Sequence, residues 1–334
     1  MMSKSRNLSE RAAARVATAA CLLTLAACVP GTNAVTRSLP STSPSREALR
    51  PTERGGMTDH VIVISVDGLR PDAIAAFGAE SIERLMREGS YTLDARTILP
   101  STTLPSHTSM LTGAEPAAHG ITWNNDRTDR RGNPTAPTIF ELARAEGLRT
   151  AAFFSKSKFH HLQVPGSLDY TTSPRGRSGK LSAEYTTARV DQYLAGARPN
   201  LLFVHIAEPD NAGHRAGWMS ATYGAAVREA DDAVTVVLRA ADEAFGPGNY
   251  TVILTADHGG HDRTHGSDDR RDVAIPWIVW GEGVRPGAPL AAGVRTMDTA
   301  ATALWLLGIA PPAVAAGVPV RAAFVGAALP RVGS

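Results

Sequence analysis

The sequence has almost no cysteine: Cys21 and Cys28 are the only two among its 334 residues. Two cysteines cannot build a disulfide framework or a thiolate zinc site, so any metal site must use histidine, carboxylate and hydroxyl ligands. The sequence also lacks a large excess of one charge, because it has 34 Lys and Arg residues and 32 Asp and Glu residues. A nearly neutral chain lacks the concentrated basic surface of most nucleic-acid-binding proteins, so we expect no nucleic-acid partner.

No apolar run is long enough to cross a membrane as a helix, which takes about 20 residues. The nearest candidate, residues 16–28, is shorter and follows a basic segment, which is typical of a secretory signal peptide. It ends in Leu25-Ala26-Ala27-Cys28, which resembles the lipobox of bacterial lipoproteins, where the cysteine carries the lipid. We expect residues 1–27 to be a lipoprotein signal peptide. The protein would then be an exported bacterial lipoprotein, anchored in a membrane through Cys28, in the periplasm or at the cell surface. An ordinary cleaved signal peptide or an uncleaved anchor is the alternative.

Residues 29–57 are rich in Pro, Ser, Thr, Gly and Arg and show no apolar periodicity. This composition is typical of a flexible linker. We therefore assign residues 28–57 to a tether and residues 58–329 to one folded domain, since no linker-like break divides that stretch. At roughly 150 residues per domain the length would also allow two domains.

Short apolar, β-branched runs alternate with helical patterns along the expected domain. The runs of strand length are residues 60–66, 149–154, 201–206, 251–254 and 274–280. The helical patterns are residues 79–88, 138–146, 183–195, 220–244 and 299–307. Continuous apolar strands that alternate with helices are typical of a mostly parallel sheet covered on both faces. The sequence therefore predicts an α/β fold.

Metal-binding side chains follow three of the predicted strands. Asp67 follows the first strand, Asp210 lies just beyond the third, and Asp257 and His258 follow the fourth. Functional groups in open α/β sheets gather at the carboxyl ends of strands, so we expect these side chains to meet. His214 lies four residues after Asp210, which places both on one side of a helical turn. A lone aspartate could equally cap a helix, but three such strand ends favour a site for Zn²⁺ or a similar ion.

A run of hydroxyl side chains, Ser101-Thr102-Thr103, precedes a segment with a helical pattern. Backbone N–H groups at a helix N-terminus point toward bound anions, and metal coordination is one way to activate a hydroxyl nucleophile. Two divalent ions about 4 Å apart can activate such a nucleophile and stabilise the leaving oxygen in phosphoryl transfer. The hydroxyls could instead only cap the helix, and this segment alone does not decide between the two interpretations.

Together these segments resemble the alkaline phosphatase superfamily, and specifically its type I phosphodiesterase/nucleotide pyrophosphatase family. The resemblance covers nearly all of residues 59–310 and rests on four motifs in the family's order: VDGLRPD, TTLPSH with the following LTG and HGI, EPD with the following GH, and DHG. It implies an alkaline phosphatase-like three-layer sandwich with a mostly parallel central sheet. It also implies two divalent metal ions, expected to be zinc.

Carried onto this sequence, the resemblance implies that Thr103 is the nucleophile and that Asn124 binds a phosphoryl oxygen. The ligands it implies are Asp210, His214 and His265 for one metal, and Asp67, Thr103, Asp257 and His258 for the other. His261 is the alternative to His265, but the His265-Gly266 pair ahead of an apolar strand matches the family's context better. Ser106 stands where most family members have Asn.

The substrate is expected to be a small phosphorylated molecule. The segment that begins at Thr103 has neither the Cys or Ser nor the Arg of the sulfatase motif, which argues against a sulfatase. A threonine nucleophile favours hydrolysis of phosphodiester or nucleotide pyrophosphate bonds through a phospho-threonine intermediate. Lys156 and Lys158 resemble a Lys-x-Lys segment that binds the substrate carboxylate in phosphonoacetate hydrolases, so a phosphomonoesterase or phosphonate hydrolase is the first alternative. A non-catalytic surface lipoprotein that binds anionic ligands is the second.

Overall fold

The computed structural model describes residues 49–326. The expected signal peptide, the lipidation site at Cys28 and most of the expected tether lie outside these residues. Within residues 49–326, no helix combines the length and the apolar character needed to cross a bilayer.

The folded part begins before Thr58, where the sequence places its start. Pro51–Arg54 form a turn of 3-10 helix (η1), and the Pro51 side chain is buried. The Arg54 guanidinium pairs with the Glu146 carboxylate at 2.6 Å. One buried proline and one ion pair leave no periodic pattern in a sequence, which is why this segment resembles the tether before it.

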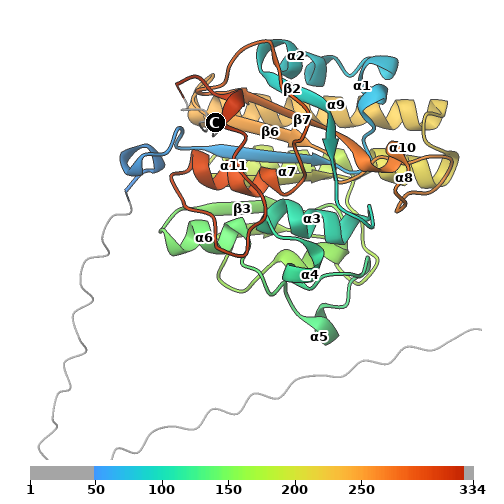
Figure 1. Cartoon of the computed structure of the whole chain (residues 1–334), viewed down its shortest axis with the longest axis horizontal. Helices are drawn as coiled ribbons and strands as arrows, with labels where there is room; N and C mark the ends of the chain where they lie inside the picture. Colours follow the sequence, from blue (N-terminus) through green and yellow to red (C-terminus); the bar gives the residue numbers. More distant parts are fainter. Residues whose placement is uncertain (1–48, 327–334) are drawn as a thin grey trace, which may run out of the picture. The chain divides into compact units, whose positions relative to one another are not determined.

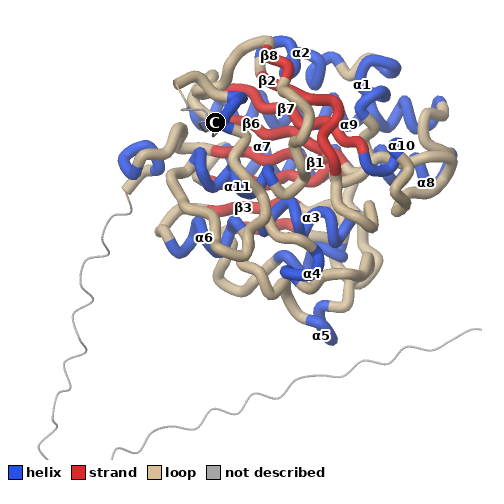
Figure 2. Tube along the Cα trace, viewed as in Figure 1, coloured by secondary structure: helices blue, strands red, loops and turns tan. Residues whose placement is uncertain are grey.

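An eight-stranded sheet forms the centre of the domain (Figure 2). Its strand order is β4-β3-β5-β1-β6-β7-β2-β8. The strands are β1 Val61–Val66, β2 Ser90–Arg96, β3 Thr150–Phe153, β4 Tyr170–Thr172, β5 Leu201–Ile206, β6 Thr251–Thr255, β7 Ala274–Gly281 and β8 Ala288–Pro289. Strand β7 runs antiparallel to both of its neighbours, and every other neighbouring pair is parallel. The predicted mostly parallel sheet is confirmed.

Helices cover both faces of this sheet (Figure 1). They are α1 Pro71–Phe77, α2 Glu80–Glu88, α3 Thr103–Thr112, α4 Pro116–His119, α5 Thr128–Arg131, α6 Ile139–Ala145, α7 Ala183–Leu194, α8 Glu208–Ala216, α9 Ala221–Phe245, α10 Arg270–Val273 and α11 Asp298–Leu306, with 3-10 turns η2 Ser157–Leu162 and η3 Arg321–Ala323. Helix α9 packs with α1, α2, α7 and α8 over one face, and α11 packs with α3 and α6 over the other. This is the predicted three-layer sandwich.

The three central strands end at the same level of the sheet. Val66, the last residue of β1, pairs with Ile206 of β5, and the preceding Ser65 pairs with Thr255 of β6. Every residue of these three strands is buried, because helices cover both faces. The loops after β1, β5 and β6 therefore emerge side by side, and this shared edge carries the candidate site.

Candidate functional site

The predicted site residues meet at the carboxyl edge of the central strands. Asp67 directly follows β1, and α8 carries Asp210 and His214 after β5. The backbones touch here, because the Asp210 N–H donates to the Asp67 carbonyl oxygen at 2.9 Å. Gly68 permits this approach: its φ is +73°, and a Cβ at that position would lie 2.9 Å from the Asp210 Cα.

A first group of ligand atoms comes from Asp210, His214 and His265, and these atoms lie within 4.8 Å of one another. The His214 Nδ1–H donates to the Arg263 carbonyl at 3.0 Å, and the His265 Nδ1–H donates to the Ser101 carbonyl at 2.8 Å. Each ring therefore keeps its Nε2 lone pair for the site. The two Nε2 atoms are 3.1 Å apart, a distance at which lone pairs repel unless a proton or a cation lies between them.

A second group comes from Asp67, Asp210 and His258, whose ligand atoms also lie within 4.8 Å of one another. The His258 Nδ1–H donates to the Gly259 carbonyl at 2.8 Å, which again leaves Nε2 for the site. That Nε2 is 3.2 Å from Asp257 Oδ2 and 3.5 Å from Asp67 Oδ1. Asp67 and Asp257, two of the ligands predicted for the second metal, therefore lie beside a third, His258.

The three aspartates share one pattern: one carboxylate oxygen is held by a donor and the other has no partner. Lys156 donates to Oδ2 of Asp67 and of Asp210, at 2.7 and 2.5 Å, and the Gly68 N–H donates to Asp257 Oδ1 at 3.1 Å. The remaining oxygens are buried without a hydrogen-bond partner: Asp67 Oδ1, Asp210 Oδ1 and Asp257 Oδ2. Unpaired buried carboxylate oxygens are costly. Since they face imidazole lone pairs, this donor set fits divalent cations held by N and O ligands.

The charges of these groups depend on one another. Burial alone would raise the pKa of Asp67, but Lys156 and the hydrogen bond from His205 lower it well below its usual range. Burial would also raise the pKa of Asp210, but Lys156 lowers it below its usual range. Burial lowers the pKa of His265 to about 4, and the neighbouring Asp210 carboxylate, 3.2 Å from Nε2, raises the pKa of His214. The aspartates are thus anionic and His265 is neutral at physiological pH, which are the forms that bind metals.

Thr103 is the first residue of helix α3 and is buried. Its Oγ1 lies 3.3 Å from His258 Nε2, at the edge of the second ligand group. The next backbone N–H, of Leu104, donates to Asn124 Oδ1 at 2.9 Å, and Lys158 Nζ donates to the same oxygen at 3.1 Å. Because Oδ1 accepts both bonds, the Asn124 amide N–H₂ is the group that can donate to a substrate.

The site opens into a cavity of about 270 Å³. The predicted site residues that line it are Thr103, Asn124, Lys156, Lys158, Asp210, His214 and His265. Asp67, Asp257 and His258 do not line it and are fully buried. A substrate in this cavity would therefore contact the nucleophile with the ligand groups directly beneath.

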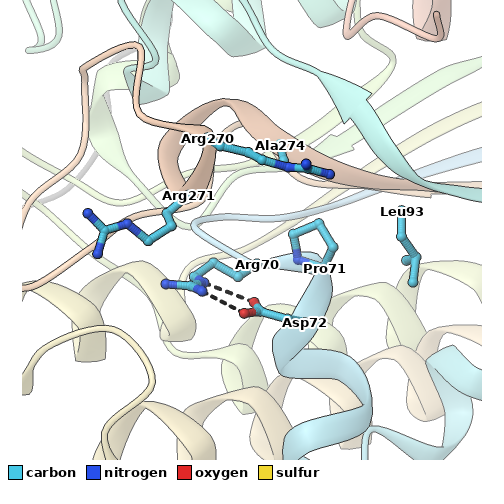
Figure 3. A pocket seen from close by; sticks show the side chains of 7 residues that line it. All are labelled: Arg70, Pro71, Asp72, Leu93, Arg270, Arg271 and Ala274. Atoms are coloured by element: carbon cyan, nitrogen blue, oxygen red, sulfur yellow. Dashed lines mark hydrogen bonds and ion pairs between the residues drawn. The ribbon is translucent and has the colours of Figure 1, made fainter. Parts of the chain in front are cut away.

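A larger cavity, of about 360 Å³, lies between α1, β2 and α10 and is drawn in Figure 3. None of the predicted site residues lines it. Its arginines are already paired, with Arg70 held by both oxygens of Asp72 and Arg271 held by Asp269. The site is therefore identified by its metal-binding and nucleophilic side chains, and not by the size of its cavity.

The two predicted substrate-binding lysines have different surroundings. Lys156 is 4% exposed; burial would lower its pKa, but Asp210 and Asp67 raise it above the ordinary lysine value. Lys158 contacts Asn124 and no carboxylate, and burial together with Lys156 lowers its pKa to about 8. Lys156 thus joins the two ligand groups, whereas Lys158 faces the position expected for a phosphoryl group.

Two buried histidines support the site and were not assigned a role from the sequence. The His107 Nδ1–H donates to the Thr103 carbonyl at 2.8 Å, and its Nε2 lies 2.8 Å from Ser65 Oγ, which ties the first turn of α3 to β1. The His205 Nε2–H donates to Asp67 Oδ2 at 2.9 Å. A histidine inside the apolar strand LLFVHI was the signal that could have identified His205.

His261, the alternative third ligand, lies apart from both groups. Its Nδ1 is 2.6 Å from Asp272 Oδ1, whereas His265 belongs to the first group. The geometry favours His265.

A family model described as "Type I phosphodiesterase / nucleotide pyrophosphatase" matches residues 61–272. Among curated proteins, the rat ectonucleotide pyrophosphatase/phosphodiesterase family member 3 is 27% identical over 218 residues. The match covers 60% of this chain and 24% of the rat protein, so the chain spans about a quarter of the length of the curated relatives it matches.

Solved structures share the fold at low sequence identity. Murine ectonucleotide pyrophosphatase/phosphodiesterase 5 has a TM-score of 0.64 and 16% identity, and the match covers 76% of this chain and 96% of that one. A mutant of the alkaline phosphatase PafA has a TM-score of 0.65 and 13% identity, with 79% and 98% covered. The expected alkaline phosphatase-like fold is confirmed.

Proposed function

Because the chain belongs to the type I phosphodiesterase/nucleotide pyrophosphatase family of the alkaline phosphatase superfamily, we propose that it is a metal-dependent hydrolase of phosphodiester and nucleotide pyrophosphate bonds. One observation carries the proposal. The Thr103 hydroxyl, at a helix N-terminus, lies 3.3 Å from His258 Nε2, beside three buried carboxylate oxygens without partners.

The proposed cofactor is a pair of divalent ions, with zinc favoured by a donor set of imidazoles and carboxylates. The proposed ligands are Asp210, His214 and His265 for one ion, and Asp67, Thr103, Asp257 and His258 for the other. Bound there, the ions would favour the deprotonated Thr103 hydroxyl and stabilise negative charge on the leaving oxygen.

The chain's own residues would position and exchange the phosphoryl group. Thr103 Oγ1 forms a bond to phosphorus while the bond from phosphorus to the leaving oxygen breaks, which gives a phospho-threonine. A water oxygen then bonds to phosphorus, and the bond to Thr103 Oγ1 breaks. The Asn124 amide and the Thr103 backbone N–H donate to a non-bridging oxygen whose charge grows in the transition state. His107 keeps the first turn of α3 in place through the Thr103 carbonyl.

Hydrolysis of phosphomonoesters or phosphonates is the second candidate, and Lys158 favours it. Its ammonium group lies 3.1 Å from Asn124 Oδ1 in the site cavity. A monoester carries one more unesterified oxygen than a diester, and a cation beside Asn124 could bind that oxygen.

The proposed substrate is a small phosphorylated molecule such as a nucleotide, in line with the family's printed description. The proposed location is outside the cytoplasm, with a lipid anchor at Cys28. Support for the anchor comes from the sequence alone: a basic start, a short apolar run and the Leu25-Ala26-Ala27-Cys28 ending.

The test compares an aryl phosphodiester with an aryl phosphomonoester, a nucleotide pyrophosphate and phosphonoacetate, each with and without a chelator. Thr103→Ala should lower kcat by about 10³-fold or more, because it removes the nucleophile. Thr102→Ala is the matched control, since the adjacent Thr102 side chain makes no cap hydrogen bond. Full activity in Thr103→Ala, or no effect of chelator, would overturn the proposal.

A further inference from the structure

A cavity rich in arginine adjoins the site cavity. It has a volume of about 440 Å³ and is lined by Asn125, Asp126, Arg127, Arg130, Arg131 and Arg177. We name its four arginines the arginine shelf. Asn125, Asp126 and Arg177 also line the site cavity, so the two cavities lie side by side.

The acidic residues near the shelf already have partners. Asp126 accepts hydrogen bonds from Thr128 and pairs with His160 at 2.7 Å. Asp129 pairs with Arg177 at 2.5 Å and more loosely with Arg130 at 3.8 Å. Within residues 49–326, neither Arg127 nor Arg131 has a carboxylate within ion-pair distance. Two guanidinium charges of the shelf are therefore uncompensated.

Both uncompensated arginines are oriented by residues that flank Asn124. Arg127 is half-buried, and its Nε–H donates to Asn125 Oδ1 at 2.7 Å. The Arg131 guanidinium lies over the Trp123 ring, 4.9 Å from its centroid. Arg127 uses only its Nε–H in this hydrogen bond, and Arg131 only stacks on the ring. The terminal N–H groups of both guanidinium groups are therefore available to a planar or tetrahedral anion.

We propose that the arginine shelf is a second anion subsite. The substrate would carry a phosphate group at a second position of the molecule, apart from the phosphate that reacts at Thr103. This rests on the proposed function, because it takes the reacting phosphoryl group to lie beside Thr103 and Asn124. The short chain segment from Trp123 to Arg131 then presents the reacting phosphate to Asn124 and the second phosphate to the shelf. A nucleotide phosphorylated at two positions has this chemistry.

The test uses two aryl esters of a nucleoside 5′-phosphate that differ only by a 3′-phosphate. The readout is the ratio of their kcat/KM values. Arg127→Ala should lower this ratio about tenfold, the value of one charge-assisted hydrogen bond, and Arg127→Lys should restore part of it. Arg198→Ala is the matched control, because Arg198 is an exposed arginine that precedes β5, at the edge of the sheet opposite to the site.

Calorimetric binding of a nucleoside 3′,5′-bisphosphate and of the 5′-monophosphate gives the same comparison without turnover. If neither ester is hydrolysed, the proposed function fails, and the binding ratio still decides on the subsite. The subsite is overturned if Arg127→Ala leaves the ratio at the wild-type value, or if Arg198→Ala lowers it equally. It is also overturned if Arg127→Ala weakens binding to anionic vesicles and leaves the ratio unchanged, because the shelf would then face a membrane.

Discussion

Replacing Lys156 by methionine should destabilise the metal-free protein more than any other single change at the site. The Lys156 ammonium is the donor shared by Asp67 and Asp210, at 2.7 and 2.5 Å, and all three side chains are buried. Methionine keeps most of the volume and flexibility of the lysine side chain but leaves two carboxylates without a cation. Removing one partner of a buried ion pair costs about 3–5 kcal/mol. For a domain of this size we expect Tm to fall by roughly 10 °C.

The assay is thermal unfolding of chelator-treated protein, followed by titration with zinc. Bound ions stabilise the native state according to their concentration and affinity. We expect zinc to raise the Tm of Lys156→Met by more than that of the wild type, because the ions would replace the missing positive charge. The difference between the metal-free proteins should narrow as the pH falls, since Asp67 and Asp210 can then take up protons.

Lys158→Met is the matched control. Lys158 lies two residues away and contacts Asn124 Oδ1 but no carboxylate, so its loss should change the metal-free Tm far less. The reasoning would be refuted if metal-free Lys156→Met unfolded at the wild-type temperature. Lys156 would then not hold the two carboxylates together.

Two further predictions concern His205 and Lys158. His205→Phe keeps an aromatic ring beside Phe159 but removes the N–H that holds Asp67, so metal affinity measured by chelator competition should fall about 10–100-fold. Partial recovery in His205→Gln would support a positioning role, and unchanged affinity in His205→Phe would contradict it. Lys158, with a pKa of about 8, is a cation below that pH and neutral above it, so KM for anionic substrates should rise as the pH increases through about 8. Lys158→Arg should abolish this rise, and a flat KM profile in the wild type would show that Lys158 does not bind substrate.

The centre of the fold could be predicted because each of its elements leaves a local pattern. Strands β1, β5 and β6 are buried on both faces and appear as continuous apolar runs. Helices α6, α7 and α9 begin after Thr138, Ser182 and Ser220, whose side chains accept hydrogen bonds from backbone N–H groups. The five predicted helices accordingly begin and end within one residue of the prediction.

The edges of the sheet could not be predicted in the same way. Strand β2 has mixed burial and shifts register between Thr92 and Ala95, so its apolar residues do not form a run. Strand β4 has three residues and β8 has two. These strands are held by pairing with a neighbour, and a single sequence does not show which neighbour that is.

Thr103 and His265 were assigned through the family resemblance, whereas Asp67, Asp257 and His258 were accessible to sequence reasoning because they closely follow strands that end at one edge. The roles of Lys156 and His205 were not, because each depends on how far a side chain reaches across the sheet. Lys156 leaves the loop after β3 and reaches past β5 to Asp67 beyond β1. Sequence spacing carries no information about such a reach, although Lys156 and Lys158 were identified as candidates through their resemblance to a Lys-x-Lys segment of phosphonoacetate hydrolases.

The surroundings of Lys156 connect the stability of the domain with its proposed chemistry. Three buried aspartates meet at one edge of the sheet, and a single ammonium group bonds two of them, while one oxygen of each has no partner. One cation cannot compensate three buried anions, so additional positive charge at this edge should stabilise the folded state as well as the reaction. Removing the ions should therefore lower Tm and activity together, whereas removing the Thr103 hydroxyl should lower activity with far less effect on Tm. If chelation abolished activity but left Tm unchanged, the ions would not be held by these buried carboxylates, and the ligand assignment would be wrong.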